Sequence, residues 1–344
     1  MKPITIVGGG LAGLTLGIGL RQRGVPVLIL EAGQYPRHRV CGEFISGRGQ
    51  EVLTRLGLGE KLRQAGARTA QTARFVSATG RELRRMLPRP AWCLSRFVLD
   101  DLLAGEFRRI GGELRERERW SEPELPAGVV RASGRLVQPV VEGWRLFGLK
   151  VHARNVDLDA DLEMHLVPNG YVGLCRLAGD VVNVCGLFRS RTTEPDLVRS
   201  WPEWVRGPAG SPLRARLAHA EFVEGSFSSV AGISLRPRRA LARNESCLGD
   251  ALTMIPPVTG NGMSMALESA ALAIEPFAAY SRDEQAWPTA QRQMGAACDA
   301  AFAARLRWAW WLQRALFHPG GQAALWFLAA NTAPLWRGLF ARTR

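Results

Sequence analysis

The chain has 344 residues, a hydrophobic content of 47% and a formal net charge of +14. The length allows a sizeable core and suggests two domains, and the hydrophobic content excludes global disorder. The excess positive charge would allow an anionic partner, but lysine occurs only at positions 2, 61 and 150 and the arginines are scattered, so we expect no nucleic-acid binding.

The cysteines and the first residues indicate in which cellular compartment the protein is expected. The six cysteines, at positions 41, 93, 175, 185, 247 and 298, form no CxxC pair, and no histidine cluster has metal-ligand spacing. The first residues look like a core strand and lack the pattern of a signal peptide. We therefore expect free thiols in a cytoplasmic protein that binds no metal.

Residues 4–20 predict a strand, a tight turn and a helix. Residues 4–7 are apolar and partly β-branched, which suits a buried parallel strand. Three glycines follow at GxGxxG spacing: the first allows the tight turn, the second lets the backbone approach a pyrophosphate, and the third lets the helix press against the strand. The predicted contacts of this turn are Gly8, Gly10, Leu11, Ala12 and Gly13.

A second buried run, residues 25–30, ends at Glu31 and Ala32. An acidic side chain at the end of this strand can bind a ribose hydroxyl. The free N–H groups at the N-terminus of the preceding helix would face the phosphates. The segment therefore predicts a bound dinucleotide. The alternative is a plain βαβ unit whose glycines serve only packing.

The segment YPRHRVCGEFIS, residues 35–46, breaks the periodic pattern and predicts a functional loop. It resembles a loop of the flavin-dependent dehydrogenases related to geranylgeranyl reductases, within the larger aromatic-hydroxylase-like flavoprotein group. The resemblance implies non-covalently bound FAD, with Arg39 near the cofactor and Cys41 and Gly42 near the isoalloxazine. Packing alone would also explain Cys41 as a small buried residue.

Ser95 begins a predicted amphipathic helix that runs to about residue 110, because serine before the helix and acids in its first turns suit an N-terminus. In the family that it resembles, an SRxxLDxxL segment begins this helix and its arginine lies against the cofactor. Arg96 is therefore a candidate FAD contact; the alternative is a surface ion pair. Ser133 replaces the aspartate of the hydroxylases' Ala-Asp-Gly signature, so the electron donor can be NAD(P)H or another reductant.

Residues 137–190 predict an antiparallel sheet that would floor a substrate chamber. Its strands are expected at 144–152, 162–167, 171–177 and 181–188, followed by a helical segment at 195–217 and a returning strand at 222–233. His152 and His165 lie in these strands and are candidate acid–base residues, although no carboxylate partner is evident for either. The alternative is a solvated or a core histidine.

Residues 246–263, SCLGDALTMIPPVTGNGM, predict a strand that ends in Gly-Asp, then a stiff loop and a helix over 264–273. They match the pattern GDAxxxxPPxxGxGM of the same flavoprotein group. The carboxylate can hold a sugar hydroxyl, the glycines let the backbone reach the ring, and the helix dipole favours negative charge on the flavin. The predicted contacts are Asp250, Pro257, Gly260, Asn261, Gly262 and Met263.

The tail after residue 281 predicts helices rich in tryptophan, at Trp308, Trp310 and Trp311, followed by an apolar stretch at 325–336. Glycines and prolines interrupt the apolar part, so we expect no membrane-spanning helix. Tryptophans with flanking arginines suit a peripheral membrane surface or a lid over an apolar pocket. Packing against the sheet is the remaining alternative.

Together these patterns predict an α/β protein with a GR2-type FAD-binding Rossmann-like domain, an inserted antiparallel β-sheet substrate domain and C-terminal helices. The FAD-binding domain is expected to be discontinuous, over residues 1–65, 91–135 and 236–285. The substrate domain would cover 66–90 and 136–235, and the helical tail 286–344.

The resemblance implies an FAD-dependent oxidoreductase, either a monooxygenase or a double-bond reductase, that acts on a hydrophobic polyketide, isoprenoid or lipid-like molecule. No catalytic residue is assigned. Halogenation is less favoured because the WxWxIP segment of tryptophan halogenases is absent. The rival is a non-catalytic, electron-carrying flavoprotein associated with a membrane.

Overall fold

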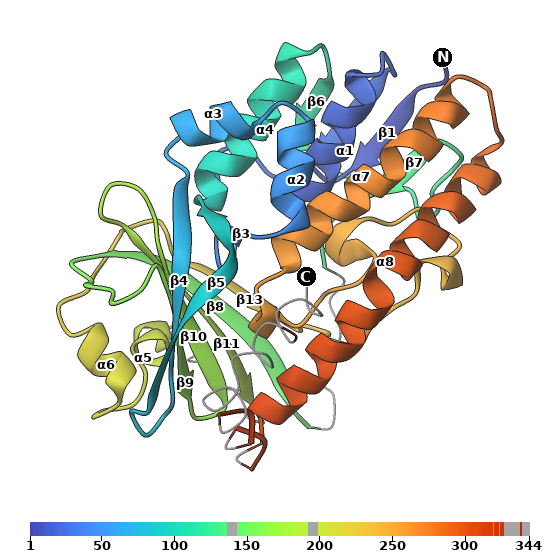
Figure 1. Ribbon diagram of the computed structural model, residues 1–344. Helices are drawn as coiled ribbons and strands as arrows, with labels where there is room; N and C mark the ends of the chain where they lie inside the picture. The colour runs from blue at the N-terminus through green and yellow to red at the C-terminus, as the bar shows by residue number, and fades with distance from the viewer. Residues whose placement is uncertain (136–142, 192–198, 319, 323, 327–337, 339–344) are drawn as a thin grey trace.

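The structure is a computed structural model that describes residues 1–135, 143–191, 199–318, 320–322, 324–326 and 338. Two β-sheets organise it, a parallel one of four strands and a mixed one of nine (Figure 1). Helices flank the small sheet, and one long helix, α8, runs from that part of the molecule down past the large sheet. The predicted α/β class, with a nucleotide-binding part and a sheet part, is confirmed.

The small sheet has the strand order β6-β2-β1-β7, and every neighbouring pair is parallel. Ile4 and Ile6 of its central strand are fully buried, as their apolar run predicts. Because the strands are parallel, their carboxyl ends share one edge, where the glycine turn follows β1 and Glu31 ends β2. The strands are β1 (Ile4–Val7), β2 (Val27–Glu31), β6 (Glu113–Glu116) and β7 (Val129–Arg131).

The helices follow the predicted pattern closely in the first half of the chain. Every residue of α1 from Leu11 to Leu20 is buried, because the helix lies between the small sheet, α4 and α7. The hydroxyl of Ser95 accepts a hydrogen bond from the N–H of Val98 and caps α4, as expected. The helices are α1 (Leu11–Arg21), α2 (Arg48–Arg55), α3 (Gly59–Gln64), α4 (Arg96–Arg109), α5 (Trp201–Arg206), α6 (Pro212–Arg216), α7 (Gly262–Ser281) and α8 (Trp287–Leu316).

The predicted strand at residues 246–250 is largely wrong. The segment makes one isolated bridge, between Cys247 and Arg131, and then turns into a short 3-10 helix, η3 (Gly249–Ala251). The backbone turns there because Gly249 adopts a left-handed conformation with φ of 58°. Two further 3-10 helices lie nearby in the sequence, η2 (Ala240–Ala242) and η4 (Pro257–Thr259).

The large sheet has the order β12-β8-β11-β10-β9-β4-β5-β3, with β13 also paired to β8. It is mixed rather than antiparallel throughout, because β4 and β9 are joined by a long connection and pair in parallel. Its strands are β3 (Phe44–Ile45), β4 (Arg68–Val76), β5 (Glu82–Cys93), β8 (Arg145–Arg154), β9 (Leu162–Val167), β10 (Gly170–Arg176), β11 (Val182–Ser190), β12 (Glu221–Phe222) and β13 (Ser228–Ala231).

The two faces of the large sheet have different neighbours, and alternation along β8 separates them. Phe147 points to a core that it shares with Trp204 of α5. Gly148, Lys150 and His152 point to the opposite face, toward the loop that precedes β3. The sheet therefore presents one of its faces to the part of the molecule that carries the glycine turn.

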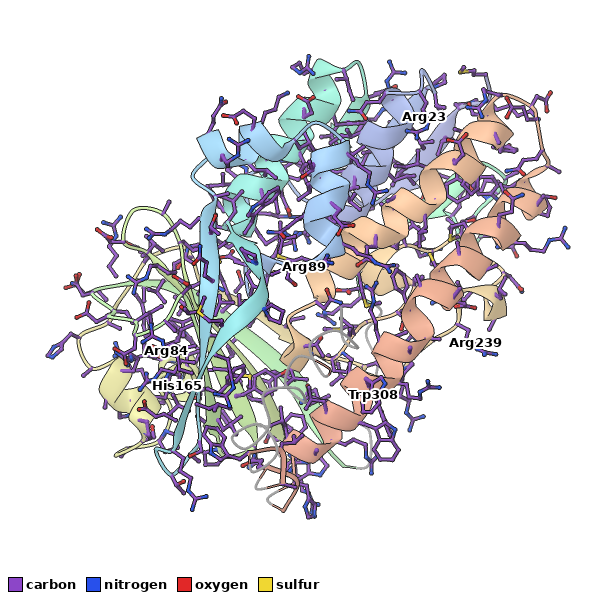
Figure 2. All side chains as sticks on the ribbon, viewed as in Figure 1. Arg23, Arg84, Arg89, His165, Arg239 and Trp308 are labelled. Atoms are coloured by element: carbon purple, nitrogen blue, oxygen red, sulfur yellow. The ribbon has the colours of Figure 1, made fainter. Side chains whose placement is uncertain are left out.

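The helix α8 is fastened to α7 by a buried ion pair. Arg305 and Glu268 make two parallel hydrogen bonds of 2.7 and 2.8 Å, and both side chains are almost fully buried. On the outer side of α8, Trp308 projects away from the sheet (Figure 2) and Trp311 is 60% exposed. No helix in the described part of the chain is long and apolar enough to cross a membrane. Most of the predicted apolar stretch, residues 327–336, lies outside the described residues.

Candidate functional site

A cavity of about 1100 Å³ extends from the carboxyl edge of the small sheet to the inner face of the large sheet. Gly10 and Glu31 line its first end, and Gly173 of β10 lines its far end. Leu316 of α8 contributes to its wall. The cavity thus touches both sheets and the C-terminal helix, and most of the predicted site residues border it.

The first end has the features that a dinucleotide requires. A Cβ built on Gly10 would meet nothing within 4 Å, so the backbone there is open to a close-lying group. The carboxylate of Glu31 accepts hydrogen bonds from the N–H groups of Gly9 and Gly33, at 2.8 and 2.7 Å. Burial would raise the pKa of Glu31, but the Gly33 N–H and neighbouring arginines hold it below its usual range. Glu31 is therefore a fixed negative acceptor, as a ribose diol needs.

Positive charge gathers beside this end of the cavity. Arg96 makes two hydrogen bonds to Asp100, of 2.7 and 2.8 Å, and Arg39 lies 3.2 Å from the same carboxylate. Burial lowers the pKa of Arg39, and repulsion by Arg96 adds to this. The predicted alternative for Arg96, a surface ion pair, is wrong because its partner Asp100 is fully buried and Arg96 lines the cavity. The arginines outnumber the acids here, which suits a pyrophosphate.

The second predicted anchor approaches the cavity from the other side. Gly260 ends η4 in a left-handed conformation with φ of 61°, and a Cβ there would overlap the ring of Phe44. Helix α7 begins at Gly262, so its N-terminus adjoins the cavity. Burial raises the pKa of Asp250 to about 6, although Arg96 and Arg135 oppose the rise. At neutral pH Asp250 is mostly ionised, and its carboxylate can accept a hydrogen bond from a hydroxyl group.

Two of the predicted contacts do not border the cavity. Gly13 serves packing, because a Cβ there would overlap the carbonyl oxygen of Gly8. Asn261 is buried at the start of α7. The roles of the other residues toward the cofactor remain predictions. Those that line the cavity are Gly8, Gly10, Leu11, Ala12, Glu31, Ala32, Arg39, Cys41, Gly42, Arg96, Asp250, Pro257, Gly260, Gly262 and Met263.

Both candidate histidines have carboxylate partners that the sequence did not reveal. Nε2 of His152 lies 2.7 Å from Glu43, and Nε2 of His165 lies 2.8 Å from Glu163. His152 faces the cavity loop, whereas His165 occupies the opposite face of the sheet. Glu43 stands next to the Cys-Gly pair of that loop, which is the one signal that could have drawn attention to it.

The comparisons with known proteins agree with this geometry. Residues 1–142 match the FAD binding domain family. Monooxygenase 1 of Arabidopsis thaliana is 31% identical over 103 residues, which are 29% of this chain and 26% of that protein. The chain spans about a quarter of the length of the curated relatives that it matches.

Solved structures share the fold over nearly the whole chain. A flavin-dependent brominase is 19% identical with a TM-score of 0.75, and the match covers 99% of this chain and 92% of that one. A geranylgeranyl bacteriochlorophyll reductase-like protein from Thermoplasma acidophilum is 17% identical with a TM-score of 0.73, covering 96% and 92%. The match to an FAD binding domain and the cavity that the predicted contacts line identify FAD as the cofactor.

The role of Asp250 can be tested on cofactor binding. We predict that Asp250→Ala weakens FAD binding by about 1–3 kcal/mol, because a sugar hydroxyl of the cofactor loses its acceptor. Titration of apoprotein with FAD, followed by flavin fluorescence, measures the change. Asp101→Ala is the matched control, since Asp101 is exposed on α4. Equal affinities of the Asp250 variant and the wild type would show that Asp250 bonds no part of FAD.

Proposed function

We propose that this FAD-binding chain is an oxidoreductase, and specifically a monooxygenase of a hydrophobic small molecule of polyketide, isoprenoid or lipid-like character. The observation that carries the proposal is the apolar chamber between the predicted flavin position and the large sheet. Most of its wall consists of aliphatic, aromatic and methionine side chains, and its polar members are Arg74, Glu163, Ser228, Ser229 and Gln322. The apolar members are Phe75, Leu83, Leu87, Leu162, Met164, Leu166, Leu187, Ile233, Met254, Val258, Leu312 and Leu316.

Part of the floor of this chamber consists of residues with a small side chain or none. Gly148, Gly173 and Cys185 lie on adjacent strands and on the same face of the sheet. A Cβ on Gly173 would meet only backbone oxygens, at 3.6 Å or more, so a larger residue there would project into the chamber. The low floor supports a flat substrate that lies between the sheet and the loop at Cys41 and Gly42.

The C-terminal helix supports the same proposal. Leu312 and Leu316 of α8, with Leu325 beyond it, cover the chamber on the side of the tail. Tyr171 of the sheet donates a hydrogen bond of 3.0 Å to Gln313, which holds this end of α8 in place. These contacts favour the lid among the alternatives for the tail. The exposed Trp308 would in addition suit contact with a membrane surface from which an apolar substrate is drawn.

Bound FAD would supply the redox chemistry, and the chain would hold the substrate, exclude water and position protons. Two other reactions have support from the fold. Double-bond reduction is suggested by the reductase-like neighbour, and halogenation by the brominase neighbour. The proposal therefore needs a test that reads all three reactions in one assay.

The test incubates FAD-loaded protein with a reductant, labelled O2 and a panel of polyketide and isoprenoid substrates, and analyses the products by mass spectrometry. We expect a product that carries one oxygen atom from O2. A product that gains two hydrogen atoms without O2 would identify a reductase. A product that forms only with bromide or chloride would identify a halogenase. Flavin reoxidation without any product would favour the electron carrier.

The chamber floor gives a sharper prediction. We expect Gly173→Leu to retain FAD but to lower kcat/KM about a hundredfold, because the added side chain displaces the substrate from the reacting position. Steady-state turnover and FAD titration on the same preparation measure both effects. Gly105→Leu is the control, since Gly105 is exposed on α4 and a Cβ there meets nothing within 4 Å. Full turnover by the Gly173 variant would show that the substrate does not lie on this floor.

A further inference from the structure

Four titratable side chains meet where the loop before β3 contacts the large sheet. The side chains of Glu43 and Lys150 are fully buried, and their Oε1 and Nζ atoms lie 3.5 Å apart. The second oxygen of Glu43 lies 2.7 Å from Nε2 of His152. On the other side, Nζ of Lys150 lies 2.9 Å from Nδ1 of His38. The result is a continuous chain from His38 through Lys150 and Glu43 to His152, which we term the buried relay.

The buried relay is costly for the fold. Removing an ammonium and a carboxylate from water is repaid only by close mutual pairing, and an apolar pair would fill the same space without that cost. Glu43 also adopts a left-handed backbone conformation, with φ of 59°, that few side chains favour. The neighbours of Lys150 on the same face of the sheet include small or apolar residues such as Gly148 and Leu187. An ionic cluster in such a place is a candidate for function.

The charges of the relay determine where its protons lie. Burial lowers the pKa of His38 to about 4, and repulsion by Lys150 contributes to the drop. His38 is therefore neutral at neutral pH. Because an ammonium has only donors, Lys150 donates to Nδ1 and the ring proton of His38 sits on Nε2. Burial also lowers the pKa of Lys150, which eases the loss of its proton although Glu43 opposes the shift.

His38 is the member of the relay that reaches the cavity. It lines the cavity next to Arg39 and Cys41, and its ring stacks on Phe97 with the centroids 4.7 Å apart. Among the described residues, no side chain bonds its Nε2. The other end of the relay, His152, is buried with 9% of its side chain exposed, and its ring packs edge-on against the ring of His38 with the centroids 4.9 Å apart.

We propose that His38 is the catalytic proton donor of this cavity and that the buried chain of Lys150, Glu43 and His152 reloads it. This inference rests on the proposed redox function of the same cavity. In the step, the Nε2–H bond of His38 breaks as the reacting oxygen or carbon of the substrate takes the proton. The N–H bond of Lys150 breaks as Nδ1 takes its proton. His38 stays neutral in its other tautomer, Lys150 becomes an amine, and no electrons are exchanged.

The amine of Lys150 is then reprotonated along Glu43, whose two oxygens face Lys150 and His152. Other titratable groups pack around the relay. Arg96 donates its backbone N–H to Glu43 at 2.9 Å, and Arg39 follows His38 in the loop. The thiols of Cys41 and Cys185 stay neutral, because burial raises the pKa of both.

The first test measures the coupling between Lys150 and His38 in the apoprotein and requires no turnover. The chain has five histidines, so each imidazole signal can be assigned and titrated by NMR. In Lys150→Met we expect the pKa of His38 to rise by about one pH unit or more, since a positive charge at 2.9 Å is removed. An unchanged pKa would overturn the relay. If the single variant does not fold, Glu43→Gln/Lys150→Met is titrated instead, and a smaller rise is expected because the loss of the Glu43 carboxylate lowers the pKa of His38.

The second test reads the step itself. We expect His38→Gln to lower kcat about a hundredfold or more while KM and FAD affinity stay within about threefold, as for loss of a general acid. Imidazole added to His38→Gly should restore turnover in proportion to the concentration of neutral imidazole, with a pH profile that follows the titration of imidazole. The control is His219→Gln, because His219 is exposed. Wild-type kcat in His38→Gln, or loss of FAD along with kcat, would overturn the role of His38.

The two tests separate this inference from the proposed function. If no substrate is turned over by the wild type, the proposed function fails, while the NMR titration of apoprotein still reads the coupling of Lys150 to His38. If turnover occurs and His38→Gln leaves it unchanged, the function stands and the proton donor lies elsewhere.

Discussion

Gly13→Ala is expected to destabilise the apoprotein. Gly10→Ala should leave the stability of the apoprotein unchanged but weaken its binding of FAD. A Cβ on Gly13 would overlap the carbonyl oxygen of Gly8, which is backbone and cannot move aside cheaply. Alanine would gain about 1 kcal/mol in helix propensity. Overpacking a rigid contact costs about 1–3 kcal/mol, so a net loss of up to about 2 kcal/mol is expected for Gly13.

Gly10 differs from Gly13 in both space and conformation. Its φ of −82° and ψ of −171° are extended, and a Cβ there meets nothing within 4 Å. Alanine is thus tolerated in the apoprotein but occupies the position where the pyrophosphate would lie against the backbone. We expect FAD affinity to fall at least about a hundredfold, or about 2.7 kcal/mol.

Urea unfolding of both apoproteins, with FAD titration of each, measures the two effects separately. The pair controls itself, because the same substitution is made three residues apart in one turn. Equal losses of stability in both variants would contradict the assignment of Gly10 to the cofactor. Tight FAD binding by Gly10→Ala would do so as well.

Arg305→Ala should destabilise the protein by about 3–5 kcal/mol, because it leaves the carboxylate of Glu268 buried without its bidentate partner. Arg48 lies 4.0 Å from the same carboxylate, but its side chain is 59% exposed and cannot replace the pair. The free energy of unfolding in urea is the measurement, with FAD saturating so that the holoprotein is compared throughout.

Two variants frame this result. Arg307→Ala on the same helix is exposed and should change the free energy of unfolding by no more than about 0.5 kcal/mol. Arg305→Met combined with Glu268→Leu should recover most of the loss, since an apolar pair needs no compensation. If Arg305→Ala behaves like Arg307→Ala, α8 is not held to α7 by this ion pair.

Local patterns predicted the parts of the fold that depend on local physics. The glycine turn at residues 8–13 follows from backbone conformation, and the cap of α4 from one hydroxyl of Ser95. The second predicted anchor borders the cavity, although its strand proved to be a 3-10 turn. In that segment a left-handed glycine overrode an apolar run that favours a strand.

The relay could not be predicted, because it depends on contacts between distant residues. Glu43 and His152 are separated by 109 positions, and Lys150 and His38 by 112. Only the pairing of β8 with β11, and the packing of the loop on that face, brings them together. Likewise the parallel pairing of β4 with β9 depends on a long connection that no local pattern describes. The proposed domain boundaries remain a prediction.

The burial of α1 has a consequence for the synthesis of the chain. This helix is made about 240 residues before one of its covers, α7, which begins at Gly262. At 5–20 residues per second, the apolar side chains of α1 wait roughly ten to fifty seconds on the ribosome before that cover emerges. The cavity is also incomplete until then, because Asp250 and Gly260 close it. FAD can therefore be captured in its complete site only after Gly260 has emerged from the ribosome, and the nascent segment made before it is a natural client for chaperones.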